Sequence, residues 1–190
     1  MAKHIVVLDG GYDAYDAEEE ILRDAGAVLE RFKGGRDDTV GKLAFARGAV
    51  GAFVRWTTMD GPAYDAAPSL RYIVRYGVGY DNLDLPAASE RGIMLCNVQG
   101  YANHAVSDHA LALSFACLRN LRQGAEQLRP KYGVPPPQHM PDSKDLTLGI
   151  VGLGRIGGTL CAKARGLFSR VLACDPYIAE ERFTDLGAEK

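Results

Sequence analysis

Residues 146–175, LTLGIVGLGRIGGTLCAKARGLFSRVLACD, decide how the fold of this chain is interpreted. The apolar run at 148–151 predicts a buried strand, residues 155–165 have helical periodicity, and a second apolar run at 171–173 stops before Asp175. Between the first strand and the helix, Gly152, Gly154 and Gly157 have GxGxxG spacing. Together these features predict one βαβ unit of the dinucleotide-binding kind.

Each glycine has a physical role in such a unit. Gly152 would allow the tight turn, Gly154 would let the backbone approach a pyrophosphate, and Gly157 would let the helix pack closely on the sheet. Free N–H groups and the positive end of the dipole at the helix start would hold the anion. The alternative is a glycine-rich turn in another α/β unit, and the strand, helix and acid at the right spacing argue against it.

Asp175 indicates which dinucleotide is expected. At the end of the second strand a carboxylate can accept both hydroxyls of an adenosine ribose, and it would repel a 2′-phosphate. No arginine follows closely, since the next one is Arg182. The sequence therefore predicts NAD rather than NADP.

Composition limits the remaining possibilities. The chain has 190 residues, of which 47% are hydrophobic and 24% charged, and its net charge is −2; this is typical of one or two soluble globular domains. No run of like charge suggests a nucleic-acid or membrane partner. We find no signal peptide and no apolar run of membrane-spanning length, and we expect a cytoplasmic protein.

The four cysteines do not form a metal site. They contain no CxxC pair, and each lies in an apolar strand or helix, so we expect four small core residues and no bound metal. These residues are Cys96, Cys117, Cys161 and Cys174.

The first half of the chain alternates between apolar strands and short helices. The expected strands are residues 5–8, 27–32, 49–56, 72–75 and 93–97. Asp16 and Asp38 are the expected N-caps of the first two helices. This alternation predicts a flavodoxin-like, doubly wound parallel sheet forming a domain over residues 1–98.

The pattern changes after residue 98. Residues 104–129 predict one long helix, with Val106, Leu113 and Cys117 on one apolar face and Leu111 and Phe115 on an adjacent one. Such a wide apolar surface suggests a helix buried between two units. Residues 130–144 predict a loop, because Pro135–Pro137 cannot be helical.

The second domain, residues 99–190, is expected to be the N-terminal part of a Rossmann domain. Only two strands follow the long helix, whereas a nucleotide-binding half has three. The chain ends at what resembles the start of another helix, so the domain is interpreted as truncated.

A second candidate site follows the fourth strand. Ligands in open α/β sheets bind beyond the carboxyl ends of the strands, where this chain has Arg75 and the run Gly77-Val78-Gly79. Arg75 could bind a small carboxylate bidentately, and the amides of Val78 and Gly79 could form an anion-binding nest. The alternative is a surface arginine beside an ordinary glycine turn.

Three stretches resemble the D-isomer-specific 2-hydroxyacid dehydrogenase family, and particularly its C-terminal-binding-protein-like and phosphoglycerate-dehydrogenase-like members. They are RYIVRYGVGYDNLDLPAASERGIMLCNVQGY at 71–101, VSDHALAL at 106–113, and LTLGIVGLGRIG at 146–157 followed by ACDPY. The resemblance implies a two-domain enzyme that transfers a hydride between NAD(H) and a 2-hydroxy or 2-oxo acid. It also implies a homodimer formed through the nucleotide-binding domain.

By match to these motifs, the resemblance implies roles for individual residues. Arg75, Val78 and Gly79 would contact the substrate. The residues implied to hold the cofactor are Val78, Val106, Gly152, Gly154, Arg155, Ile156, Gly157 and Asp175. The family's catalytic arginine, glutamate and histidine are expected beyond Lys190, so no catalytic residue is assigned and the 190 residues are expected to be inactive. A non-catalytic NAD(H)-sensing or protein-interaction module and a truncated gene product remain alternatives.

Overall fold

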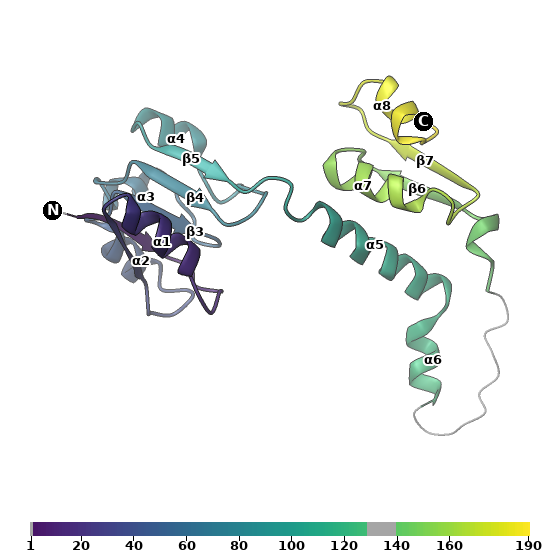
Figure 1. The fold of residues 1–190 in the computed structure, drawn as a ribbon, viewed down its shortest axis with the longest axis horizontal. Coiled ribbons are helices and arrows are strands. Elements are labelled where there is room, and N and C mark those ends of the chain that lie inside the picture. Colours follow the sequence, from purple (N-terminus) through teal and green to yellow (C-terminus); the bar gives the residue numbers. More distant parts are fainter. Residues whose placement is uncertain (1, 129–139) are drawn as a thin grey trace. The chain divides into compact units, whose positions relative to one another are not determined.

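The computed structural model describes residues 2–128 and 140–190. They form two compact units, Met1–Gln99 and Gly100–Lys190, and each is described by itself (Figure 1). The expected loop at 130–144 lies mostly outside the described residues. Its last part forms a short 3-10 turn, Ser143–Asp145.

A five-stranded parallel sheet forms the first unit, with strand order β2-β1-β3-β4-β5. The strands are β1 (Lys3–Val7), β2 (Ala27–Arg31), β3 (Gly51–Val54), β4 (Tyr72–Arg75) and β5 (Met94–Asn97). Val6 pairs with Ala52, Ala52 with Ile73, and Ile73 with Leu95. The third strand is shorter than the predicted 49–56, and the other four lie where the alternation predicted them.

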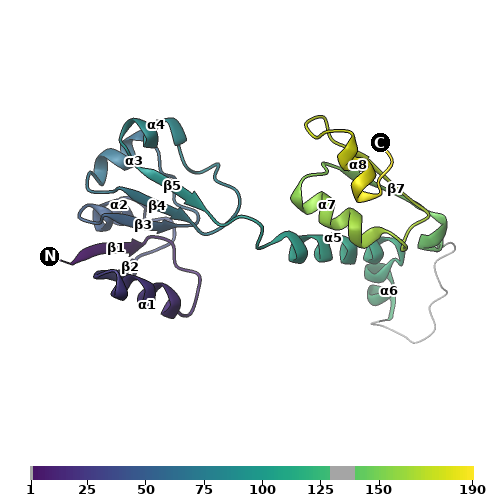
Figure 2. The same cartoon turned by 45° about the horizontal axis from the view of Figure 1, so that its top comes forward.

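Four helices connect these strands, with α1 on one side of the sheet and the other three on the opposite side (Figure 2). They are α1 (Asp16–Asp24), α2 (Thr39–Ala46), α3 (Gly61–Ala66) and α4 (Leu85–Glu90). This arrangement makes the sheet doubly wound.

Aspartates cap three of these helices. Asp38, Asp60 and Asp84 each accept a hydrogen bond from the amide three residues later, at 2.8, 3.0 and 3.0 Å. The prediction for Asp38 is confirmed. The prediction for Asp16 is wrong, because Tyr15 occupies the cap position, no side chain caps the helix, and Asp16 is its first residue. In the first turn its charge still suits the helix dipole.

Apolar side chains from both halves of the alternation form the core of this unit. Val6, Val54, Ile73 and Leu70 are at most 1% exposed, and Tyr64 of α3 is buried beside them. Consecutive parallel strands covered on both faces bury nearly continuous apolar runs. The core therefore places the carboxyl ends of β1, β3 and β4 side by side at one edge.

The second unit is built around two parallel strands, β6 (Thr147–Val151) and β7 (Arg170–Cys174), joined by helix α7 (Arg155–Ala164). Helices α5 (Asn103–Leu118) and α6 (Leu121–Leu128) precede them, and α8 (Glu181–Leu186) follows. Ile150, Leu153, Cys161 and Phe183 are buried in its core.

The helix expected near the end of the chain is present as α8, but the chain continues beyond it. Gly187 closes α8 with a positive φ of 68°, and the backbone then runs parallel to β7. The Glu189 N–H donates to the Val171 carbonyl at 2.8 Å, and the Ala173 N–H donates to the Glu189 carbonyl at 2.7 Å. Residues 188–190 thus begin to pair with β7 as a third strand, which corrects the prediction that only two strands follow the long helix.

The single long helix predicted at 104–129 is two helices. The break falls at Asn120, which has a φ of 50° and is the one non-glycine residue with positive φ in the described part of the chain. Asparagine tolerates this left-handed conformation better than most residues, so the apolar periodicity continues across a residue that ends the helix. Arg129 lies outside the described residues.

Of the two apolar faces predicted for this helix, the one that contains Leu111 and Phe115 packs in the structure. Leu111, Phe115 and Leu118 pack on the second core. Val106 and Leu113 are 44% and 54% exposed. Within the second unit, α7 and the β6–β7 sheet cover one face of α5, and the expectation that α5 is buried between two units stays a prediction.

Only one of the four cysteines is a core residue. Cys161 is buried, whereas Cys96, Cys117 and Cys174 are exposed. Cys96 lies on edge strand β5 opposite the core-facing Leu95, and Cys174 alternates with the buried Ala173. An apolar segment therefore does not bury all of its side chains, because strand residues alternate between two faces. No helix among the described residues is long and apolar enough to cross a membrane.

Candidate functional site

The glycine-rich loop between β6 and α7 has the geometry expected of an anion cradle. Gly152 adopts a φ of 90°, which favours glycine. A Cβ at Gly157 would collide with the Gly152 carbonyl oxygen, so this glycine allows the close helix–loop approach. Gly154 is exposed, and a Cβ there would meet nothing within 4 Å. The space beside Gly154 is therefore open.

The start of α7 is free to receive an anion. Gly154 occupies the N-cap position and provides no side-chain cap, and Arg155 and Ile156 are the first two helical residues. Both side chains are exposed. Uncapped amides at a helix start are donors for an external acceptor, such as a phosphate.

Asp175 lies directly beside this loop. One carboxylate oxygen accepts the Leu153 N–H at 2.7 Å, and the other accepts the Tyr177 N–H at 2.9 Å. The hydrogen bonds from Tyr177 and Leu153 lower the pKa of Asp175 below its usual range, so the group is ionised at neutral pH. A carboxylate oxygen has a second lone pair, so Asp175 can hold the loop and still accept a ligand hydroxyl.

Val106 lies on α5, the helix that packs against α7. Lys163 of α7 fastens the two helices: its amine donates to the Ser107 hydroxyl at 2.8 Å and the Asp108 carboxylate at 2.6 Å. Ser107 is fully buried at this contact, while Val106 beside it is 44% exposed. All the residues predicted to hold a dinucleotide, except Val78, therefore lie in the second unit.

Arg75, Val78 and Gly79 lie together at the carboxyl end of β4 in the first unit. The guanidinium Nη1 of Arg75 donates to the Tyr76 carbonyl at 3.3 Å, and its buried Nε has no hydrogen-bond partner among the described residues. A Cβ at Gly77, which has a φ of 154°, would collide with the same guanidinium. The glycine thus makes room for Arg75, which keeps unused donors.

The turn after β4 is held by a residue that the sequence did not single out. The Asn97 side-chain amide donates to the Val78 carbonyl at 2.7 Å, and the Val98 N–H donates to the Gly77 carbonyl at 3.1 Å. Asn97 ends β5 in register with Arg75. The sequence did contain one indication of this role, because Asn97 is a polar residue at the end of the strand next to β4.

A buried ion pair also escaped sequence analysis. The Lys42 amine lies 2.6 Å from the Asp9 carboxylate, and their side chains are 4% and 1% exposed. Asp9 further accepts the amides of Arg55, Trp56 and Thr57 at 2.7–2.8 Å. Burial alone would raise the pKa of Asp9, but the hydrogen bonds from Lys42 and from the backbone outweigh it and hold the pKa well below its ordinary value.

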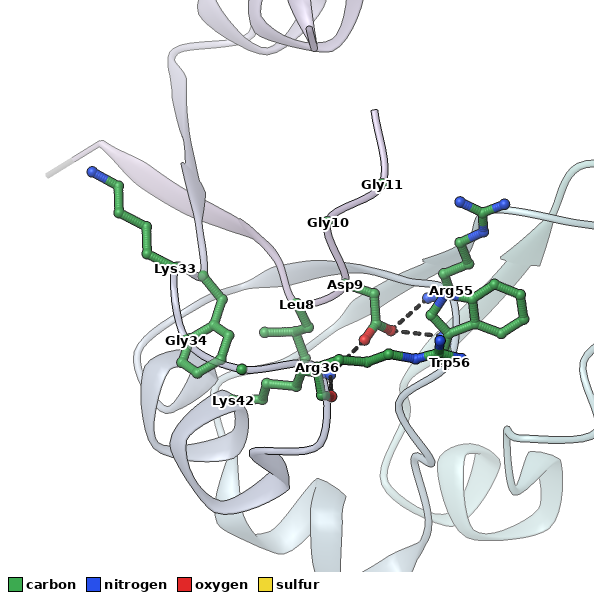
Figure 3. A pocket seen from close by; sticks show the side chains of 12 residues that line it. Leu8, Asp9, Gly10, Gly11, Lys33, Gly34, Arg36, Lys42, Arg55 and Trp56 are labelled. Carbon is green, nitrogen blue, oxygen red and sulfur yellow. Dashed lines mark hydrogen bonds and ion pairs between the residues drawn. The ribbon is translucent and has the colours of Figure 1, made fainter. Parts of the chain in front are cut away.

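This pair joins three loops. Asp9 follows β1, Thr57 follows β3, and Lys42 also donates to the Arg36 carbonyl after β2 at 2.5 Å. Above it lies a cavity of about 370 Å³, called here the Asp9 pocket (Figure 3). Its lining residues are Leu8, Asp9, Gly10, Gly11, Phe32, Lys33, Gly34, Gly35, Arg36, Lys42, Arg55 and Trp56.

No group of three or more histidine, cysteine, aspartate or glutamate side chains suited to a metal occurs within residues 2–128 and 140–190. The start of α7 presents uncapped amides, and the turn after β4 presents the unused guanidinium donors of Arg75. They are suited to phosphate and carboxylate ligands.

Comparison with known proteins identifies relatives. The sequence matches the model of a family described as "D-isomer specific 2-hydroxyacid dehydrogenase, catalytic domain" over residues 5–185. It is 37% identical over 133 residues to the D-3-phosphoglycerate dehydrogenase of Mycobacterium leprae, covering 70% of this chain and 25% of that protein. It is 36% identical over 135 residues to the glyoxylate reductase of Korarchaeum cryptofilum, covering 69% and 41%.

The fold agrees with a solved relative. The NAD⁺-bound 3-phosphoglycerate dehydrogenase of Entamoeba histolytica superposes with a TM-score of 0.71 at 26% identity, covering 96% of this chain and 57% of that one. The 190 residues thus span between about a quarter and three fifths of the relatives they match.

Proposed function

Because this chain belongs to the D-isomer-specific 2-hydroxyacid dehydrogenase family, we propose that it supplies the substrate-binding and NAD-binding parts of an oxidoreductase acting on a 2-hydroxy or 2-oxo acid. The observation that carries the proposal is the loop Gly152–Gly157 with Asp175 bonded to it at 2.7 Å. It combines an uncapped helix start with an ionised carboxylate at the end of the next strand.

The second unit would bind NAD as an incomplete Rossmann unit. The α7 amides, with Arg155 and Ile156 beside them, would hold the pyrophosphate, and Asp175 would accept the ribose hydroxyls. Val106 would lie near the nicotinamide. NAD, when bound, supplies or accepts the hydride, and the protein supplies binding and orientation.

The first unit would bind the acid. The unpartnered Nε and the remaining guanidinium donors of Arg75 suit a carboxylate, which Arg binds bidentately. Val78 and Gly79 would line the site, and the Asn97 side chain holds their turn through the Val78 carbonyl. Proton transfer to the 2-oxo oxygen needs a titratable acid, and we infer that this group lies outside these 190 residues.

A titration of NADH fluorescence with the 190-residue chain tests the cofactor site. We expect saturable binding of NADH and weaker binding of NADPH. Replacing Asp175 with alanine should weaken NADH binding about tenfold or more, because hydrogen bonds to a charged acceptor are lost. The same substitution should also reduce the ratio of the NADH affinity to the NADPH affinity, because the carboxylate that repels a 2′-phosphate is removed.

The matched control is Asp185→Ala, which removes one carboxylate from exposed helix α8 of the same unit. It should leave NADH affinity unchanged. Equal effects of the two substitutions, or no NADH binding by the unsubstituted chain, would contradict the proposed cofactor site.

A turnover assay tests the rest of the proposal. The 190-residue chain, purified free of host dehydrogenases, should not oxidise NADH with glyoxylate or pyruvate. Steady oxidation would show that the proton-transfer group lies within these residues. A sensing module would also bind NADH without turnover. Assaying a longer protein that contains this chain would distinguish the two, because a dehydrogenase would then oxidise NADH and a sensing module would not.

A further inference from the structure

Helix α5 is anchored to the core of the second unit through its later turns. The apolar anchors are Leu111, Phe115 and Leu118. The start of the helix lacks such support, because its N-cap residue, Ala102, provides no side-chain cap and Val106 is 44% exposed. Apolar packing therefore leaves the position of residues 103–108 to other contacts.

One side chain of α7 supplies these contacts. The Lys163 amine donates to the His104 carbonyl at 3.0 Å and to the Ser107 hydroxyl at 2.8 Å. Its third hydrogen bond, at 2.6 Å, goes to the Asp108 carboxylate, so all three donors of the ammonium group are used. Figure 1 and Figure 2 both show α7 alongside the first half of α5. Lys163 therefore fixes the start of α5 to α7.

These three hydrogen bonds contribute more to geometry than to stability. The Asp108 side chain is 68% exposed, and an ion pair with a solvent-exposed partner adds little to the free energy of unfolding. The buried Ser107 hydroxyl also donates to the His104 carbonyl at 2.9 Å, so it keeps a hydrogen bond when the lysine amine is removed. Loss of the amine would therefore leave no buried polar group unpaired, and would release the start of α5 without unfolding the unit.

The two helices that Lys163 joins contribute different parts of the proposed cofactor site. The uncapped start of α7 is proposed to hold the pyrophosphate, and Val106 of α5 is proposed to lie near the nicotinamide. Val106 lies between His104 and Ser107, and the lysine amine bonds to both. Covalent bonds fix the separation of pyrophosphate and nicotinamide within a dinucleotide, so both contacts can form at once only if the two helices are held in the matching position.

We propose that Lys163 is a positioning residue for the nicotinamide half of NAD(H). It acts through Val106, whose position relative to α7 it sets, and it lies about two helical turns beyond the amides that would hold the pyrophosphate. The inference rests on the proposed function, because it assumes that the start of α7 and Val106 contact one dinucleotide. It predicts that Lys163 affects the binding of the nicotinamide end and leaves the binding of the adenosine and pyrophosphate end unchanged.

Comparing NADH with ADP-ribose tests the inference, because ADP-ribose contains the pyrophosphate and the adenosine ribose but lacks the nicotinamide. Each ligand is titrated into the 190-residue chain and binding is measured by calorimetry. Lys163→Met keeps an unbranched side chain and removes the amine. It should raise the dissociation constant of NADH about threefold or more and leave that of ADP-ribose unchanged. Lys163→Arg keeps a cation with N–H donors and should restore most of the NADH affinity.

The matched control is Lys144→Met, which removes an exposed lysine of the same unit that lies 3.8 Å from Asp142. It should leave both dissociation constants unchanged. Hydrogen exchange measured by mass spectrometry provides a readout without ligand. Lys163→Met should speed exchange over residues 103–108 and leave exchange over residues 155–164 unchanged, because only the start of α5 is released.

Equal weakening of NADH and ADP-ribose binding, or failure of Lys163→Met to fold, would show that Lys163 supports the fold alone. Unchanged NADH affinity would show that it has no role in binding. Each of these results overturns the inference and leaves the proposed cofactor site standing. Equal affinities of the two ligands for the unsubstituted chain would also overturn it, because the nicotinamide would then gain nothing from a contact. If the unsubstituted chain bound neither ligand, the proposed cofactor site itself would be wrong, and the inference with it.

Discussion

The two units of this chain are built from the same local pattern but reach different degrees of burial. In the first, β1, β3 and β4 each have a parallel partner on both sides, and Val6, Ala52 and Ile73 are at most 2% exposed. In the second, β6 pairs only with β7 among the described residues, and Val151 is 94% exposed. Ile150, one residue earlier in β6, is only 6% exposed. Side chains alternate between the two faces of a strand, so the layer that covers each face determines which of them are buried.

The units also differ in how they hold the loops of their candidate sites. In the first, a buried ion pair joins three loops at once. In the second, one half-buried carboxylate, Asp175, holds the glycine loop through a single backbone bond to Leu153. Removing one partner of the buried ion pair would strongly lower the stability of the first unit. The single bond from Leu153 to Asp175 leaves the other amides of the glycine loop available to a ligand.

The largest expected effect comes from breaking the buried pair. Lys42→Met leaves Asp9 charged without its cation, and removing one partner of a buried pair costs about 3–5 kcal/mol. Urea unfolding followed by Trp56 fluorescence should show this loss. Lys33→Met, an exposed lysine of the same pocket, should change stability by less than about 0.5 kcal/mol. Similar losses in both variants would contradict the anchoring role.

A smaller effect is expected in the second unit. Gly157→Ala places a methyl group against the Gly152 carbonyl, and overpacking of this kind costs about 1–3 kcal/mol. Hydrogen exchange measured by mass spectrometry should show faster exchange over residues 147–189, with residues 2–99 unchanged. Gly154→Ala meets open space and should not speed exchange. If Gly154→Ala were the more disruptive substitution, the described loop geometry would be wrong.

The smallest effect is the acid dependence of the first unit. The pKa of Asp9 is lowered in the fold, so its contribution is complete above its ordinary value of 3.8 and is lost as pH falls below it toward the folded value. Between pH 7 and pH 3, the stability difference between the unsubstituted chain and Asp9→Asn should shrink by about 1 kcal/mol. A difference that stays constant over this range would show that Asp9 is not ionised in the fold.

Local patterns predicted most of the first unit. The five strands and the Asp38 cap depend on residues near one another in the sequence, where apolar runs and capping distances are informative. The wrong predictions concern helix ends and side-chain burial, which depend on the surrounding structure. Asn120 ends a helix that apolar periodicity would continue, and Cys96 is exposed because it lies on the face of β5 opposite Leu95.

The candidate sites divide in the same way. The Gly152–Gly157 loop and Asp175 were recognisable because they lie within thirty residues, and Arg75 because it ends a strand. Asn97 and the Asp9–Lys42 pair were not singled out. Asp9 and Lys42 are 33 residues apart, and nothing near either one in the sequence indicates a buried partner.

The sequence by itself determined the alternation of strands and helices, the glycine spacing and the family, because these depend on short-range periodicity and on motifs. The tertiary structure alone decided which face of α5 packs, that residues 188–190 return along β7, and that Asp9, Lys42 and Thr57 meet in a buried cluster. The physical reason is that these contacts join distant segments. They are set by how many layers and neighbouring strands surround each element.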